Sequence, residues 1–152
     1  MKAFGLSIAV VAALSLAVLG AAAARNSNAR PATVATGRTA LGRIVVDGRG
    51  RTLYLFEKDR RGRSACSGAC ATYWPPLLTH GKAVATGGAK QSLVGMIRRA
   101  DGTRQVTYAG HPLYSFALDT RRGQTKGEGL NDFGGGWDAL APSGKKIEGG
   151  DD

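Results

Sequence analysis

Two cysteines are the residues of this chain whose type and spacing most plainly suggest chemistry. Cys66 and Cys70 are its only cysteines, and they lie four positions apart. In an oxidising compartment such thiols can close a small loop, because one helical turn places both side chains on the same face. A disulfide is therefore the leading interpretation. The alternative is a reducible dithiol or a copper(I) site, which would need further ligands from His80, His111 or Met96.

A second unit combines two aromatic rings with a carboxylate. Residues two apart on a strand share a face, so its Tyr and Phe form one aromatic surface and its Asp lies just past the strand. One interpretation is a binding face for a small cation or a sugar. The favoured interpretation is a core aromatic pair with an Asp that caps the following turn, since packing would repeat the same unit in two copies. The two copies are Tyr54-x-Phe56-x-x-Asp59 and Tyr114-x-Phe116-x-x-Asp119.

The remaining candidates do not assemble into a catalytic set. Ser64, Ser67 and Ser92 lie outside any Gly-x-Ser-x-Gly elbow, and no base is evident for them. The glycines at 134–136 lack the Gly-Lys-Ser/Thr ending of a nucleotide loop, so we expect them to let the backbone pass close to Trp137. The sequence therefore predicts a protein without enzymatic activity, and with neither a metal nor a cofactor.

The amino terminus has the features of an export signal. Lys2 is followed by an uncharged apolar run over 6–19 and by small residues through Ala24, which fit a signal-peptidase site. The run is shorter than the roughly 20 residues that a membrane-spanning helix needs. Residues 1–24 are predicted to be a cleaved signal peptide, which leaves no transmembrane segment. No Cys lies near the cleavage point, so we expect a soluble periplasmic or extracellular protein without a lipid anchor.

The charge balance is strongly basic. The chain has 21 Lys and Arg against 11 Asp and Glu, and the loss of Lys2 with the signal peptide lowers the net charge from +10 to +9. This charge favours anionic partners, here envelope polymers or the membrane surface. The basic residues are scattered along the chain, so solubility is an equally good explanation, and we expect no specific binding of nucleic acid. The oligomeric state stays open.

Short apolar runs between glycine-rich turns indicate β structure. A strand over 44–46, a turn over 47–50 and a strand over 52–56 are expected, and the second strand is apolar on both faces, so we expect it to be covered twice. A three-stranded meander is expected over 96–99, 105–108 and 113–116. One short helix near 67–74, capped by Ser67, and a weaker helical turn over 91–94 complete the elements.

The chain also repeats itself. Residues 41–44 match 94–97 and residues 53–59 match 113–119, and each copy then reaches Arg-Arg-Gly and a Trp, at Trp74 and Trp137. We therefore expect a single small all-β domain of two pseudo-symmetric repeats that complete each other's core, arranged as a sandwich or a propeller-like assembly.

The predicted boundaries follow from this repeat and from composition. The domain is expected over 40–142, with repeat one at about 41–78 and repeat two at about 94–142. Residues 25–39 are expected to be a flexible leader, with at most an edge strand near 33–35, and residues 143–152 a disordered tail.

Together the motifs resemble a known family. The paired Tyr-x-aromatic-x-x-Asp units, the Cys66-x-x-x-Cys70 segment with Trp74-Pro75-Pro76-Leu77, and the Phe133-Gly134-Gly135-Gly136-Trp137 segment are similar to the bacterial secreted-repeat family of predicted lipoproteins. The resemblance covers about 41–142 and implies an exported repeat domain, but no biochemical role. Many members carry a lipidated Cys that this chain lacks.

These observations favour a non-enzymatic exported envelope or secreted protein that acts as a binding or scaffolding module. The alternative is an extracytoplasmic thiol-redox or metal-binding module that uses Cys66 and Cys70.

Overall fold

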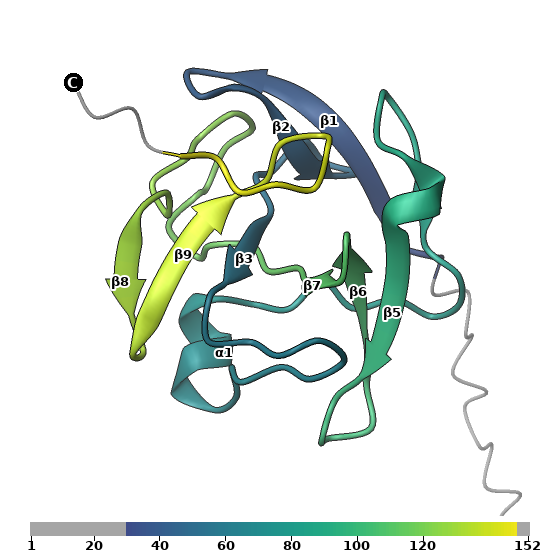
Figure 1. Cartoon of the computed structure of the whole chain (residues 1–152), viewed down its shortest axis with the longest axis vertical. Helices are drawn as coiled ribbons and strands as arrows, with labels where there is room; N and C mark the ends of the chain where they lie inside the picture. Colours follow the sequence, from purple (N-terminus) through teal and green to yellow (C-terminus); the bar gives the residue numbers. More distant parts are fainter. Residues whose placement is uncertain (1–29, 149–152) are drawn as a thin grey trace, which may run out of the picture.

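The computed structural model describes residues 30–148 of the chain. The predicted signal peptide, the first residues of the leader and the last four residues of the tail lie outside the described part. Nine strands form three three-stranded sheets in residues 30–148, together with one short α-helix and one 3-10 turn (Figure 1). The β-rich class and the short helix are confirmed.

The first sheet is built on a hairpin of β1 (Thr33–Thr39) and β2 (Gly42–Asp47), and β4 (Val84–Ala85) joins β1 in parallel. The expected flexible leader is therefore corrected from residue 33 onward. Val34 is fully buried, and the backbone from Val34 to Thr39 pairs with β2 throughout. Pairing with a strongly apolar neighbour overrides the weak apolar pattern of the segment itself.

The second sheet joins the two halves of the chain. It has the order β3-β9-β8, with β3 at Tyr54–Phe56, β9 at Gly135–Ala139 and β8 at Leu130–Asp132. All three residues of β3 are buried, as expected for a strand covered on both faces. The strand is shorter than predicted, because only Thr52 of the preceding residues forms a bridge, to Val46.

The third sheet is the predicted meander. It contains β5 (Val94–Arg98), β6 (Arg104–Tyr108) and β7 (His111–Pro112) in that order. The third strand, expected over 113–116, is corrected to His111–Pro112, because the chain then leaves the sheet and crosses to the first repeat. The Tyr54 N–H donates to the Tyr114 carbonyl at 2.8 Å, and the Tyr114 N–H donates to the Tyr54 carbonyl at 3.0 Å.

Around the paired Tyr54 and Tyr114, the last segment of each repeat pairs with the other repeat. β3 of the first repeat pairs with β9 of the second, while Tyr114 of the second repeat bridges Pro76 of the first. The hairpin β1–β2 precedes β3 as β5–β6 precedes Tyr114. The predicted match of 41–44 with 94–97 is therefore corrected. Residues 94–97 lie in the first strand of their hairpin, whereas residues 42–44 lie in the second strand of theirs.

The helical segments are short. α1 spans Ala69–Tyr73, and η1, a 3-10 turn, spans Gln91–Leu93. The residue that precedes α1 is Gly68, so the expected cap at Ser67 is corrected: no side chain caps this helix. Gly68 takes a φ of 57°, a left-handed conformation that suits glycine, and this bend moves Ser67 out of the capping position.

The expected disordered tail is also corrected for its described residues. Leu140 forms a bridge with Lys146, and the Ile147 N–H donates to the Ala139 carbonyl at 2.7 Å. Ile147 packs against the aromatic core. The apolar contact of Ile147 explains why this Gly- and Lys-rich segment folds back.

Candidate functional site

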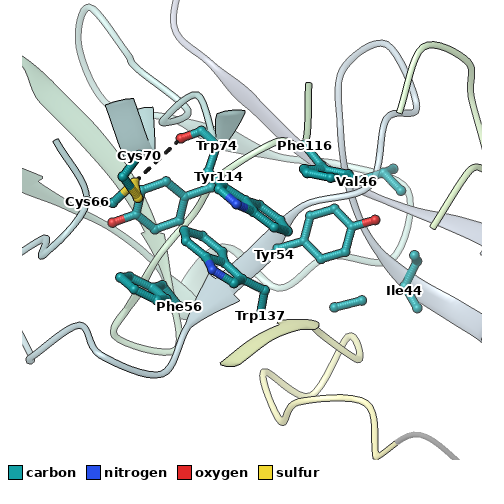
Figure 2. Packing of buried hydrophobic residues seen from close by; sticks show 11 residues of the cluster. Ile44, Val46, Tyr54, Phe56, Cys66, Cys70, Trp74, Tyr114, Phe116 and Trp137 are labelled. Atoms are coloured by element: carbon teal, nitrogen blue, oxygen red, sulfur yellow. Dashed lines mark hydrogen bonds between the residues drawn. A yellow bond between two sulfur atoms is a disulfide. The ribbon is translucent and has the colours of Figure 1, made fainter. Parts of the chain in front are cut away.

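Four aromatic rings stack in one column at the centre of the protein (Figure 2). Trp74 and Trp137 lie in the middle, with ring centroids 3.9 Å apart and planes 7° apart. Phe56 stacks on the outer face of Trp137 at 4.1 Å, and Phe116 stacks on Trp74 at 4.3 Å. Each Trp therefore stacks on the Phe of the other repeat, so the column can form only when both repeats are folded together.

The two motif tyrosines enclose the column from its sides. Tyr54 meets Trp74 edge-on at 5.4 Å and 84°, and Tyr114 meets Trp137 at 5.2 Å and 85°. Stacked and edge-on contacts are the favoured geometries for aromatic pairs. Both tyrosines and both tryptophans are fully buried, so these rings present no open face to a ligand.

The carboxylates of the repeated unit also cross between repeats. The Tyr54 hydroxyl donates to Asp119 Oδ2 at 2.5 Å, and the Tyr114 hydroxyl donates to Asp59 Oδ2 at 2.8 Å. The other oxygen of each Asp accepts a backbone N–H from its own following loop, from Ala65 for Asp59 and from Lys126 for Asp119. The turn-organising role expected for each Asp is present, but its tyrosine partner was not foreseen.

Burial sets the ionisation of this network. Desolvation raises the pKa of the Tyr54 hydroxyl far above its ordinary value, and the hydrogen bond to Asp119 raises it further. Desolvation likewise raises the pKa of Tyr114. Burial also raises the pKa of the Asp59 carboxyl, against opposing hydrogen bonds from the Ala65 N–H and the Tyr114 hydroxyl. The tyrosines are therefore held as neutral donors, which suits a structural network.

The glycines at 134–136 make a close backbone approach, but to β3. A Cβ on Gly135 would lie 2.8 Å from the Phe56 ring, and a Cβ on Gly136 would lie 2.6 Å from the Glu57 carboxylate. The expected passage of this backbone close to Trp137 stays a prediction. Phe56 needs this space because it stacks on Trp137 from the strand next to β9.

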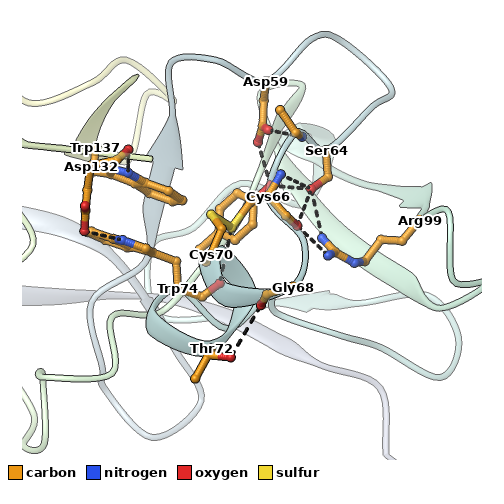
Figure 3. The surroundings of a disulfide bond; sticks show 12 residues. Asp59, Ser64, Cys66, Gly68, Cys70, Thr72, Trp74, Arg99, Asp132 and Trp137 are labelled. Atoms are coloured by element: carbon orange, nitrogen blue, oxygen red, sulfur yellow. Dashed lines mark hydrogen bonds between the residues drawn. A yellow bond between two sulfur atoms is a disulfide. The ribbon is translucent and has the colours of Figure 1, made fainter. Parts of the chain in front are cut away.

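The predicted disulfide between Cys66 and Cys70 is confirmed, with the two Cα atoms 5.3 Å apart (Figure 3). Both residues are buried, with exposed fractions of 1% and 6%, and both belong to the aromatic core cluster. The bond fixes the loop that leads into α1 and thereby positions Trp74, whose N–H donates to the Cys70 carbonyl at 2.8 Å.

The metal and dithiol alternative gains no support from the described residues. Within residues 30–148, no group of three or more His, Cys, Asp or Glu is placed to hold a metal ion. His80 lines a separate cleft with Thr79 and Arg104, and Met96 is exposed on β5. His111 lies in β7, where burial and then the positive charge of Arg61 lower its pKa.

A cleft of about 670 Å³ opens beside the disulfide, and we call it the disulfide cleft. One wall comes from the loop after the first motif and the other from the turn between β5 and β6. Its lining carries three arginines and a single carboxylate: Gly62, Arg63, Ser64, Cys66, Ser67, Arg98, Arg99, Ala100 and Asp101.

Arg99 lies at the base of this cleft and is only 9% exposed. Its Nη1 donates to Ser64 Oγ at 2.9 Å, and its Nη2 donates to the Cys66 carbonyl at 2.7 Å (Figure 3). The Nη1 also donates to Gln105 Oε1 at 2.7 Å. Among the described residues its Nε finds no hydrogen-bond partner, and no carboxylate lies within ion-pair distance of the guanidinium.

A chain of hydrogen bonds joins the cleft to the repeated motif. Ser64 Oγ lies 2.7 Å from the Tyr114 hydroxyl, which in turn donates to Asp59. The base of the cleft is therefore anchored on the core. Arg99 and Ser64 were missed as site residues in the sequence. The available signal was strand alternation, which places Arg99 on the same face as the buried Ile97.

Charge is distributed unevenly between surface and interior. Seventeen of the described Lys and Arg residues are exposed, whereas the exposed acidic residues of this region are only Glu57, Asp101 and Glu148. The other carboxylates are at least partly buried, and all of them except Asp138 accept hydrogen bonds within the fold. Asp47, for example, is 5% exposed and accepts bonds from the Arg49 and Arg51 backbone N–H groups.

Comparison with known proteins agrees with the repeat. A family model described as a secreted repeat of unknown function matches residues 35–78 and again residues 95–141. The chain belongs to this family of secreted repeats. Within the family, the first repeat therefore begins before the expected residue 41 and includes most of β1, as the two hairpins indicate. No curated protein and no solved structure matches the chain. In the described residues, no helix has the length and apolar character needed to span a membrane.

Proposed function

We propose that this secreted-repeat protein is a soluble, non-enzymatic binding module without a lipid anchor, and that its basic surface holds an anionic polymer of the cell envelope. The observation that carries the proposal is the separation of charge, with seventeen exposed cationic residues against three exposed acidic ones in the described region. Scattered surface cations with few opposing carboxylates create a positive potential that attracts and retains polyanions.

Two of the three exposed carboxylates have partners within the fold. Glu57 lies 2.7 Å from the Lys146 ammonium, and Asp101 Oδ1 accepts two hydrogen bonds from Thr103. The positive charges outnumber their partners, because the described structure contains only three ion-pair contacts and these involve Arg51 and Lys146 alone.

The interior supports a binding role more than a catalytic one. The buried tyrosine hydroxyls and the aspartates of the two motifs are hydrogen-bonded to one another across the repeats. Ser64, one of the serines weighed as a nucleophile, bonds to Arg99 and Tyr114, and its described contacts include no histidine. The thiol-redox alternative has less support, because both sulfur-bearing residues are buried in the core.

The proposal is tested by chromatography of the mature protein on phosphocellulose and on unmodified cellulose as the neutral control. We expect retention on phosphocellulose alone at about 0.01 M salt and elution as salt rises, because the Debye length falls from about 30 Å to about 10 Å by 0.1 M. Passage through phosphocellulose without retention at low salt contradicts the proposal. Sedimentation with phosphatidylglycerol vesicles, compared with phosphatidylcholine vesicles, shows whether a membrane surface is an equal partner.

A further inference from the structure

The disulfide cleft has a counterpart in the other half of the molecule. The counterpart cleft measures about 270 Å³ and is lined by Arg38, Thr39, Arg122 and Gly123, with residues of the β2 end and its turn. The family matches begin at residues 35 and 95, so Arg38 and Thr39 correspond to Arg98 and Arg99. The loop after Asp119 is one residue longer than the loop after Asp59, because Asp119 accepts the N–H of Lys126 where Asp59 accepts that of Ala65. In these loops Arg122 and Gly123 therefore correspond to Arg61 and Gly62.

The two clefts are lined by different residues, although the cores of the two repeats are built from the same residue types. The buried core uses the same Tyr, Phe, Asp and Trp in both repeats. The disulfide cleft, by contrast, has Arg63 in its lining where the second repeat has Gln124, and the buried Arg99 where its counterpart has Thr39. It also contains the only disulfide of the chain. These features are present once, so the symmetry of the fold does not explain them.

Arg99 is the most informative of these differences. A guanidinium that is nine-tenths buried loses much of its hydration, and this cost is normally offset by an opposing carboxylate. Arg99 instead bonds to the neutral oxygens of Ser64, Gln105 and Cys66. Its positive charge is therefore held in place at the cleft without a carboxylate in ion-pair contact, although the carboxylates of Asp59 and Asp101 lie near enough to attract it.

We infer that the disulfide cleft is a specific site for a phosphate group, and this inference rests on the proposed binding of an anionic polymer. Arginine suits phosphate because its planar fork donates to two oxygens at once. Arg63 and Arg98 supply these donors from the rim, and the buried Arg99 supplies fixed positive charge from below. Asp101 also lies at the rim, where its Oδ1 is held by the Thr103 N–H and hydroxyl. The volume of about 670 Å³ leaves room for the groups on either side of the phosphate.

The test compares two charge-matched double variants. Arg63→Ser with Arg98→Ser removes the rim of the disulfide cleft, and Arg38→Ser with Arg122→Ser removes the two arginines of the counterpart cleft. All four residues are exposed, and none makes a side-chain hydrogen bond or ion pair in the described structure, so both variants should fold. Equal melting temperatures to the parent protein check this directly.

Binding is measured by NMR titration with inorganic phosphate, with acetate as the carboxylate control, and by titration with polyphosphate. We expect phosphate to shift the amide signals of Ser67 and Ala100 in the parent and in the counterpart-cleft variant. We expect the disulfide-cleft variant to bind phosphate at least tenfold more weakly. Glycerol phosphate and phosphatidylglycerol vesicles then distinguish a polymer phosphate from a lipid headgroup as the source.

Each failure has a separate meaning. Equal weakening by both double variants, or retention on phosphocellulose without phosphate shifts at the cleft, overturns the specific site and leaves the basic-surface proposal standing. A parent protein that is not retained on phosphocellulose and yet shifts at Ser67 with phosphate overturns the polymer proposal and leaves the phosphate site. Acetate shifts as large as those of phosphate would falsify the assignment to phosphate.

Discussion

At the residue scale, the repeated motif acts through side chains of the opposite repeat. Tyr54 and Asp119 are separated by 65 positions in the sequence, and Tyr114 and Asp59 by 55. The spacing inside each motif correctly indicated aromatic side chains on one face and an Asp at the following turn. It could not indicate that each Tyr bonds to the Asp of the other repeat, because a hydrogen bond between distant segments depends on how the two copies dock.

Removing one crossing hydroxyl should destabilise the fold. In the parent, the Tyr54 hydroxyl donates to the buried Asp119 carboxylate and accepts the Gly127 N–H. Tyr54→Phe removes both hydrogen bonds. We expect a loss of about 1–3 kcal/mol in the free energy of unfolding, because a buried polar group without its bond bears its desolvation cost. Urea denaturation measures the loss. Tyr73→Phe, at an exposed tyrosine, is the control and should change little.

The Asp59 carboxyl gives a pH dependence of known sign. Burial raises its pKa in the folded protein, so the folded state binds the proton more readily than the unfolded state. Its contribution to stability therefore increases as the pH falls through the folded pKa and decreases as the pH rises again. Compared with Asp59→Asn, the parent should gain relative stability between pH 7 and pH values near 4. A parent that loses stability relative to the variant over this range contradicts the assignment.

At the element scale, the strands that sequence patterns predict well are those with strong apolar content. The first two strands of the meander and the doubly covered β3 lie close to where they were expected, whereas the third strand lies at His111–Pro112 and not over 113–116. β1 was expected only as an edge strand near 33–35, and the segment through Ile147 was expected to be disordered. Val34 is the one buried residue of β1 and Ile147 is only partly buried, so backbone pairing holds both segments in place. The same limit applies to Arg99, whose burial depends on oxygens from the 64–66 loop of the other repeat.

The disulfide is expected to act as a structural staple for the loop that carries Trp74. Replacing both cysteines by Ala should lower the free energy of unfolding by about 2 kcal/mol or less through lost loop closure, because the closed loop is short. Both residues are buried, so we expect the native protein to resist mild reductant and to be labelled by alkylating agents only after denaturation. Mass measurement after each treatment checks this. Rapid labelling of the native protein would favour the thiol-redox alternative.

At the scale of the whole molecule, the fold places its charges in two different locations. Carboxylates hold turns and tyrosines in the interior, as Asp59 and Asp119 do, while nearly all cationic side chains remain at the surface. The net charge of +10 was evident from composition alone. Its separation from the acidic residues was not, because the sequence does not reveal which carboxylates are used internally.

The measurement that tests the central claim most directly is the salt dependence of the dissociation constant for polyphosphate. If exposed Lys and Arg bind the polymer, the affinity should fall steeply and linearly in a plot of log affinity against log salt, because binding releases counterions. The slope should be less steep for the Arg63→Ser and Arg98→Ser variant. An affinity that does not change with salt, or an absence of binding at the lowest salt, contradicts the account.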